Sequence, residues 1–532
     1  MKKANSILLH CCAGRTRLEG PDKRAGDATP GIRVESTTLF RCQRKSASRF
    51  VVLLGIAVSA ALASCSLAPP LKTPDVPTAS TYKEIAPWTI AQPADRLPRD
   101  SWWAIYGDAQ LDDLQKKLIA NNPDLAAALA SYNQARAFSD QVRSGLFPTI
   151  TGSADVERDR QSDNKPLRGP ISASPSYYSS NTVGAEATYE LDLWGRVRNE
   201  VASGNALAQA AAADLENARL SLIAELVDDY IQLRGFDRDS AILDDTVKAY
   251  RRALDLTKQR HDGGIAPGLD VARAQTQLDV ARSQFAQTLA QRALMEHAIA
   301  ALVGESASQF SIAVQTDEIK LPQVPTGIPS TLLQRRPDVA AAQRRMESSN
   351  ADVGVARAAF FPSITLNAGG GYQSTQFPNW LQAPNSFWAI GPSALLTIFD
   401  AGKRNAQVTQ ARAALDEASA KYRSVALSAF QQVEDNLALL DHYHDASEAE
   451  KSAVAAAQRS LDFSMDRYRE GAVNYLDVVT SQTAALQTQR DALDLDTRQL
   501  RASVALIRAL GGGWSVSEDM AQSKKLGADQ HG

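Results

Sequence analysis

The chain has 532 residues, of which 44% are hydrophobic, 22% charged and only 6% aromatic. This length allows several domains, and few aromatic side chains suit close helix–helix contact better than a bulky globular core. Residues 65–532 carry 46 Lys and Arg against 56 Asp and Glu, a net charge of −10. Such an acidic body argues against a nucleic acid as partner.

Cysteine is confined to the first 65 residues. The four cysteines are Cys11, Cys12, Cys42 and Cys65. Disulfides and cysteine-based metal sites are therefore excluded from the rest of the chain.

Residues 1–64 are predicted to be an N-terminal extension and a lipoprotein signal peptide. A basic stretch at 41–49 precedes an apolar region of 14 residues at 50–63, too short for a comfortable transmembrane helix. The following "LASC" resembles a bacterial lipobox, which predicts a covalent lipid on Cys65. No other cofactor is predicted. The alternative is an ordinary signal peptide. Residues 65–104, with seven prolines between 69 and 98, are predicted to be a lipid-anchored extended arm.

The chain then repeats itself. "NNPDLAAA" (121–128) matches "RRPDVAAA" (335–342) at an offset of 214 residues, and Gly264 matches Gly471 at an offset of 207. The predicted divisions are a first repeat (105–304), a linker (305–329), a second repeat (330–514) and a polar tail (515–532).

Each repeat contains a region of strand-like alternation, at about 149–193 and 363–399. Apolar residues alternate with polar ones, as in "VGAEATYELDL" (183–193), which predicts two hairpins of roughly ten-residue strands. Strands of about this length cross a bilayer when tilted. The predicted loops, around 158–182 and 374–386, contain aromatic residues that suit a membrane interface: Tyr177, Tyr178, Phe377 and Trp380.

Two interpretations of these strands remain open. A soluble sheet with one wet face is the commoner case, and four strands cannot close a membrane barrel unless several chains share it. The acidic side chains of the polar face would point into the barrel lumen in the second case and into solvent in the first. They are Asp155, Glu157, Glu186, Glu190 and Asp192.

Long helical hairpins follow the strands, at about 195–303 and 402–510. Residues 403–470 contain neither Gly nor Pro and would span about 100 Å as a helix. Apolar residues at 3,4 spacing from Val408 to Ala429 predict a coiled-coil seam. Gly264 and Gly471 are expected to end the long helices by taking a positive φ.

Together with the lipobox and the duplication, "RRPDVAAA…FFPS…FDAGKR…YREG…NYLDV…ALGGGW" resembles the TolC-type outer membrane efflux channels, in particular the lipoprotein branch serving resistance–nodulation–division pumps. The resemblance covers about residues 100–514. It implies a mostly helical α+β fold in a homotrimer. Four strands from each chain would form one 12-stranded outer membrane β-barrel, continuous with a long periplasmic coiled-coil α-barrel.

The resemblance also implies function and partners. The expected function is a passive exit channel of a tripartite pump in the outer membrane of a Gram-negative bacterium. It would export drugs, solvents, other small toxic molecules or metal ions. Its expected partners are outer membrane lipids, a periplasmic adaptor and an inner-membrane transporter. The alternatives are a conduit for type I protein secretion and a periplasmic coiled-coil lipoprotein scaffold that forms no channel.

In this family the hairpin tips close the periplasmic mouth. The matching positions predict aperture residues at Arg467, Tyr468, Leu476, Asp477, Thr480 and Asp270. Three copies of Asp477 on the axis would favour cations, although a second acidic ring found in some members is Thr480 here. The alternative is that Asp477 and Asp270 are helix N-caps. Gly264 and Gly471 are further expected to contribute to adaptor contact.

No catalytic or metal-binding residues are predicted. The chain has no P-loop, no G-x-S-x-G and no H-E-x-x-H motif. His442 and His444 are two positions apart on a predicted helix, so their side chains diverge and cannot chelate one ion.

Overall fold

The computed structural model describes residues 66–77, 82–83, 101–162, 177–322 and 336–512. Three predicted features lie wholly outside this range: the signal peptide, the lipid site Cys65 and the tail at 515–532. The linker predicted at 305–329 lies partly outside it.

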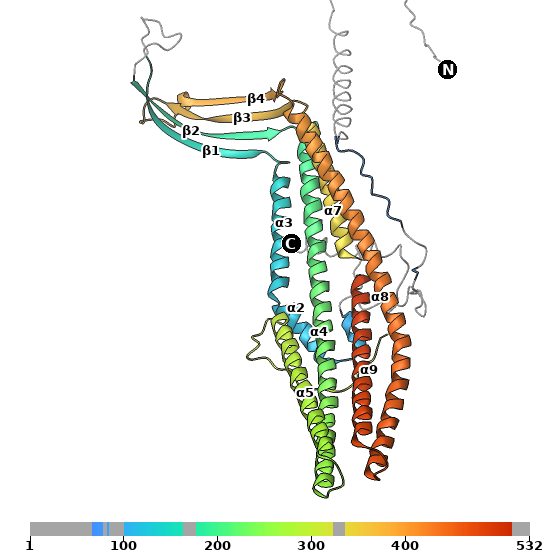
Figure 1. The fold of residues 1–532 in the computed structure, drawn as a ribbon. Helices are drawn as coiled ribbons and strands as arrows, with labels where there is room; N and C mark the ends of the chain where they lie inside the picture. The colour runs from blue at the N-terminus through green and yellow to red at the C-terminus, as the bar shows by residue number, and fades with distance from the viewer. Residues whose placement is uncertain (1–65, 78–81, 84–100, 163–176, 323–335, 513–532) are drawn as a thin grey trace, which may run out of the picture. The chain divides into compact units, whose positions relative to one another are not determined.

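The described chain consists of long helices and one four-stranded sheet (Figure 1). In the first repeat the elements are η1 (Trp102–Tyr106), α2 (Ala109–Asn121), α3 (Pro123–Ser144), β1 (Thr149–Arg160), β2 (Tyr177–Glu190), α4 (Arg196–Asp262) and α5 (Gly268–Leu302). In the second they are α7 (Pro337–Ala358), β3 (Ser363–Ser374), η2 (Ala383–Asn385), β4 (Ser386–Leu395), α8 (Lys403–Arg469) and α9 (Tyr475–Ala509).

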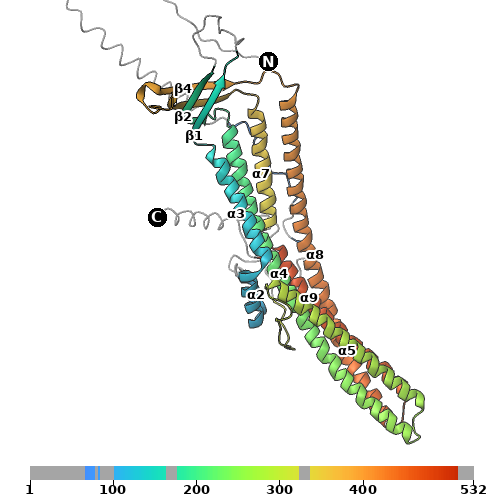
Figure 2. The ribbon, with the colours of Figure 1, turned by 90° about the vertical axis from the view of Figure 1, so that its left-hand side faces the viewer.

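The duplication is visible in the helices. α3 and α7 both begin with a proline in the first turn, where a missing N–H costs nothing. α4 and α8 are each 67 residues long, and α5 and α9 are each 35 residues long. The helical hairpins predicted at 195–303 and 402–510 are therefore confirmed to within one residue. In Figure 2, α5 lies along α4 over the lower part of that helix.

The sheet is antiparallel throughout, in the order β1-β2-β3-β4. Because residues paired across strands share a face, the register separates the two faces of the sheet. Ile150 pairs with Ala187 on one face, and Thr151 pairs with Glu186 on the other. The predicted alternation is confirmed over the strands themselves.

The predicted ends of the strands are corrected. β4 ends at Leu395, so Leu396 and Ile398 lie beyond it. Here the chain turns into α8, through Ala401 and Gly402 at φ values of 53° and 89°. The loop predicted at 158–182 is shorter, because β1 continues to Arg160 and β2 already starts at Tyr177.

Two features of the sheet are unusual for a sheet that stands alone. Within the described chain, β1 pairs only with β2 and β4 only with β3, which leaves one long edge on each side. On the apolar face, Ile150, Trp388 and Ile390 are 75%, 79% and 67% exposed. Unpaired edges and exposed apolar surface both favour association with further partners.

The main hydrophobic core lies where α2, α4, α7, α8 and α9 meet. A buried ion-pair cluster lies on α4 and α5. Asp237, with no exposed side-chain surface, accepts from Arg234 at 2.7 Å and from Arg292 at 2.6 Å. The two guanidinium groups also donate to the carbonyls of Ala313 and Ile312, which fastens the segment after α5.

The arm that follows Cys65 packs against the helices. Leu67 O accepts from Arg357 at 3.1 Å, and Pro69 O accepts from Asn350 at 2.9 Å, both on α7. The Ser66 hydroxyl donates to Asn199, near the start of α4, at 2.9 Å. Residues 66–77 of the arm form no helix or strand, as predicted, but the predicted arm extends too far, because residues 102–104 already belong to η1.

None of the described helices combines the length and the apolar character needed to cross a membrane.

Candidate aperture at the hairpin tips

The two helical hairpins reverse direction by the same local device. Gly264 and Gly471 take φ values of 76° and 81°, a region that costs other residues about 1–2 kcal/mol. The N–H groups just beyond each glycine close the end of the preceding helix. Ile265 N donates to Arg260 O at 2.7 Å, and Ala472 N donates to Arg467 O at 2.8 Å. The predicted positive-φ role of both glycines is confirmed.

Side chains of the two hairpins pack into one tip cluster. Its buried residues are Tyr250, Leu254, Ala274, Leu278, Ala281, Tyr468, Tyr475 and Val478. Tyr468 is 4% exposed, and its ring packs edge-on against Tyr475 with 5.3 Å between the ring centroids. Burial raises the pKa of Tyr475 well above its usual range and that of Tyr250 to about 12. The cluster therefore joins one hairpin to the other through buried side chains.

Arg260 crosses from the first tip to the second. Its guanidinium lies over the Tyr468 ring, 4.7 Å from the centroid, and its Nη1 donates to Tyr468 O at 2.5 Å. The same nitrogen lies 3.5 Å from Arg469 O. These carbonyls belong to the last turn of α8, where helix carbonyls carry partial negative charge, although Tyr468 O also accepts from Gly471 N at 3.0 Å.

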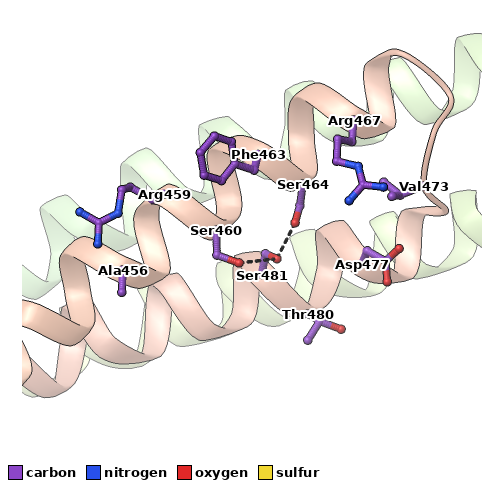
Figure 3. A pocket seen from close by; sticks show the side chains of 10 residues that line it. All are labelled: Ala456, Arg459, Ser460, Phe463, Ser464, Arg467, Val473, Asp477, Thr480 and Ser481. Carbon is purple, nitrogen blue, oxygen red and sulfur yellow. Dashed lines mark hydrogen bonds between the residues drawn. The ribbon is translucent and has the colours of Figure 1, made fainter.

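Arg467 points into a different environment from Tyr468. It lines an open groove of about 800 Å³ between α8 and α9, together with Arg459, Phe463, Asp477 and Thr480. Figure 3 shows Arg467 and Asp477 beside the turn, while Ser460 and Ser464 meet Ser481 further along the hairpin. The predicted pair Arg467–Tyr468 is thus divided, one residue lining the groove and the other inside the tip cluster.

The N-cap interpretation of the two aspartates is wrong. α9 is capped by Asn474, whose side chain accepts from the backbone N of Asp477 at 3.3 Å. α5 has Pro267 at the cap position, and Asp270 lies within its first turn. Asp477 also stands in a first turn, where a carboxylate is stabilised by the helix dipole without being the cap.

The remaining aperture candidates lie in two environments. Asp477 and Thr480 are exposed, and Leu476 beside them is 46% exposed. The Thr480 hydroxyl donates to the carbonyl of Leu476 in its own helix, at 2.9 Å. Asp270 is 6% exposed, with its carboxylate 3.5 Å from Arg273. In this structure Asp270 therefore does not share the exposed surface of the other candidates.

The acidic residues predicted for the barrel lumen also fall into two groups, one exposed on the sheet and one paired with arginines of α4. Asp155, Glu157 and Glu186 are exposed on the polar face of the sheet. Glu190 is held by Arg196 at 2.6 Å, and Asp192, beyond the end of β2, accepts from Arg198 at 3.1 Å. These two carboxylates fasten the start of α4 to the end of the sheet.

Three residues of the site, Arg260, Tyr250 and Tyr475, carry no sequence motif that marks them. The 207-residue offset does pair Arg260 with Arg467 and His261 with Tyr468. That pairing was the available signal that the first tip holds a counterpart of the basic and aromatic positions. It does not reveal that Arg260 acts on backbone carbonyls of the other hairpin.

Comparison with known proteins identifies the family. The profile of the outer membrane efflux protein family matches residues 114–305 and 328–512. The toluene efflux pump outer membrane protein TtgC of Pseudomonas putida is 30% identical over 465 residues, covering 87% of this chain and 96% of TtgC. The antibiotic efflux pump outer membrane protein ArpC, also of Pseudomonas putida, shows the same identity and coverage.

A solved structure agrees. The Campylobacter jejuni CmeC outer membrane channel superposes with a TM-score of 0.81 at 25% identity, over 87% of this chain and 98% of CmeC. The chain therefore belongs to the outer membrane efflux protein family and works as an outer membrane exit channel.

Proposed function

We propose that three copies of this chain form the channel by pairing their sheets edge to edge, β4 of one copy with β1 of the next. The observation that carries this proposal is the four-stranded sheet with two unpaired edges and an exposed apolar face. Twelve strands would close a barrel and leave no edge, which a bilayer requires.

In this barrel the apolar face meets lipid and the polar face lines the lumen. Ile150, Trp388 and Ile390 would contact acyl chains, whereas Asp155, Glu157 and Glu186 would face the passage. Phe377 and Trp380, whose ring centroids are 5.6 Å apart, would lie at the interface beyond β3. Aromatic residues are enriched at this level in outer membrane barrels.

The long helices would continue the passage into the periplasm as an α-barrel. The channel itself is passive, and the energy comes from an inner-membrane transporter of the resistance–nodulation–division type through a periplasmic adaptor. The aperture lies at the hairpin tips, with Leu476, Asp477 and Thr480 toward the passage. The turns at Gly264 and Gly471 are the proposed contact region for the adaptor.

For the cargo we propose small toxic organic molecules, such as solvents and antibiotics. The support is the match to TtgC and ArpC, whose names give toluene and antibiotics. Metal ions or a secreted protein are the alternatives. Growth of a deletion strain in toluene, antibiotics or metal salts decides between them: sensitivity to metal alone, or loss of a secreted protein alone, would contradict an organic cargo.

We also propose that Cys65 carries the lipid anchor. The support is the arm next to it, since Ser66 bonds Asn199 near the start of α4, only a few residues from the sheet. Mass spectrometry of the mature N-terminal peptide tests this. A peptide starting at Cys65 with added acyl mass is expected; an unmodified peptide, or one starting elsewhere, would contradict the anchor. Cys65→Ser is the matched control.

The trimer is tested by native mass spectrometry of the detergent-extracted protein. The expected mass is three chains. As a control, charging the apolar face by Ile390→Lys should prevent stable insertion, because Lys at mid-membrane costs about 2–4 kcal/mol. Extracted protein that stays monomeric and never conducts in planar bilayers would support the periplasmic lipoprotein scaffold instead.

A further inference from the structure

We infer that Arg260 is a positioning residue for the aperture: it ties the tip of the α8–α9 hairpin to the tip of α4–α5 within one chain and so holds the closed position. This inference rests on the proposed channel function. Arg260 itself does not line the exposed groove of Arg467 and Asp477. It acts through the backbone of the turn that carries them.

One residue, Arg260, makes hydrogen bonds at both tips, with its carbonyl at the first and its side chain at the second. The carbonyl of Arg260 accepts from Ile265 N at 2.7 Å and from Ala266 N at 3.1 Å, which ends the first hairpin's long helix. The side chain of the same residue donates to Tyr468 O at 2.5 Å in the last turn of α8. A movement of one tip away from the other must therefore break the guanidinium contacts or distort the first turn.

The site favours arginine over other residues. A planar guanidinium can lie over an aromatic ring while its N–H groups donate within its own plane, which an ammonium cannot do. Here it lies over the Tyr468 ring, 4.7 Å from the centroid, and approaches two carbonyls of a helix C-terminus, whose dipole attracts a cation. A Cβ on Gly471 would stand 3.7 Å from Nη2, so the turn and the side chain lie against each other.

The tie is asymmetric between the repeats, which argues against a purely local helix-ending role. Arg467 is the counterpart of Arg260 at the 207-residue offset. Its carbonyl also ends a helix, by accepting from Ala472 N at 2.8 Å, but its side chain lines the open groove. Only the first of the two matched arginines reaches across to the other hairpin, so the second hairpin is the one that is held.

The test is the conductance of purified protein in planar bilayers. Arg260→Ala should raise the current through the closed channel about tenfold. Arg260→Lys keeps the charge but lacks the planar guanidinium, so its current should lie between those of Arg260→Ala and the wild type. Arg252→Ala is the matched control, because Arg252 is exposed two turns earlier on α4. Its current should equal that of the wild type.

A double-mutant cycle separates a tie from general loosening. Because Arg260→Ala and Tyr468→Leu both remove the contact between the guanidinium and the ring, their effects on the current should be less than additive in the double variant. Full additivity would overturn the inference. If Arg260→Ala fails to assemble, Arg260→Gln takes its place, since it keeps a donor without the charge; a folded Arg260→Gln with wild-type current and wild-type thermal stability would equally overturn it.

The outcomes also distinguish this inference from the proposed function. A channel that conducts, and that opens further in Asp477→Ala but not in Arg260→Ala, would overturn the tie and leave the channel standing. Assembled protein that never conducts, in the wild type or in any variant, would contradict the channel itself.

Discussion

Tyr468 and Tyr475 pack edge to face across the turn of the second hairpin, with ring centroids 5.3 Å apart. The Tyr468 hydroxyl is buried, and no described residue accepts or donates a hydrogen bond to it. The ring, rather than the hydroxyl, therefore joins the tips in this structure.

This relationship predicts that Tyr468→Phe is neutral or slightly stabilising, because it removes a buried polar group that lacks a partner. Tyr468→Ala should cost about 3–5 kcal/mol, since it opens a cavity under Arg260. Thermal denaturation and bilayer current of the two variants check this. A Phe variant as leaky as the Ala variant would show that the hydroxyl makes an essential bond in the assembled channel.

The positive φ of the tip glycines gives a prediction with an internal control. Gly264→Ala should destabilise the first tip by about 1–2 kcal/mol, because a Cβ strains a residue held at φ 76° even though nothing stands within 4 Å of it. Gly263→Ala should cost less, since Gly263 has a φ of −78°. Hydrogen exchange of the turn amides measures both. Equal protection in the two variants would be inconsistent with strain as the cause.

The buried cluster on α4 and α5 should be the most sensitive point of the described core. Asp237→Ala leaves Arg234 and Arg292 buried without their carboxylate, at a cost of about 3–5 kcal/mol. Asp244→Ala, which removes an exposed pair with Lys248, should change stability by less than about 1 kcal/mol. Thermal melting of the extracted protein compares them. Similar melting temperatures would mean that the buried pairs contribute no more than surface ones.

Asp229 predicts a pH dependence. Burial, with help from the nearby carboxylates of Asp228 and Glu225 and against the pull of Arg501, raises its pKa from 3.8 to about 6. Because the folded form holds the proton more tightly, this contribution to stability is complete below about pH 4 and is lost as the pH rises through 6. At pH 8 the free energy of unfolding of Asp229→Asn should therefore exceed that of the wild type by about 1 kcal/mol, after allowance for solvent screening of a half-buried group.

The advantage of Asp229→Asn should shrink at pH 5, where the wild-type carboxyl is largely protonated. Melting at pH 5 and pH 8 measures it, with the exposed Asp113→Asn as control. A difference that is the same at both values would contradict the raised pKa.

Much of the fold follows from simple features of the sequence. The absence of Gly and Pro over residues 403–470 located α8, and the glycine beyond it located the turn. The alternation of apolar residues assigned the faces of the strands, because period two places every second side chain on one side. The end of β4 could not be predicted in this way, since Leu396 and Ile398 continue the alternation although the chain has already left the sheet.

The site was less predictable, for physical reasons. Neighbouring helix residues point about 100° apart, so Arg467 and Tyr468 could not both face the same surroundings, and the sequence does not say which side of α8 is covered. The role of Arg260 was hidden because its acceptors are backbone carbonyls, which every residue has. Asn474, rather than Asp477, caps α9, because the helix already begins at Tyr475 and the Asn474 side chain accepts from one of its first free N–H groups.

The most direct test of the account is the ion current through purified trimers in a planar bilayer, measured for the wild type, Asp477→Ala and Thr480→Asp. A small wild-type current is expected. Loss of Asp477 should increase it severalfold, and an added carboxylate at position 480 should raise the preference for cations. Trimers that never conduct would contradict the exit channel, and a current and selectivity untouched by both substitutions would remove Asp477 and Thr480 from the aperture.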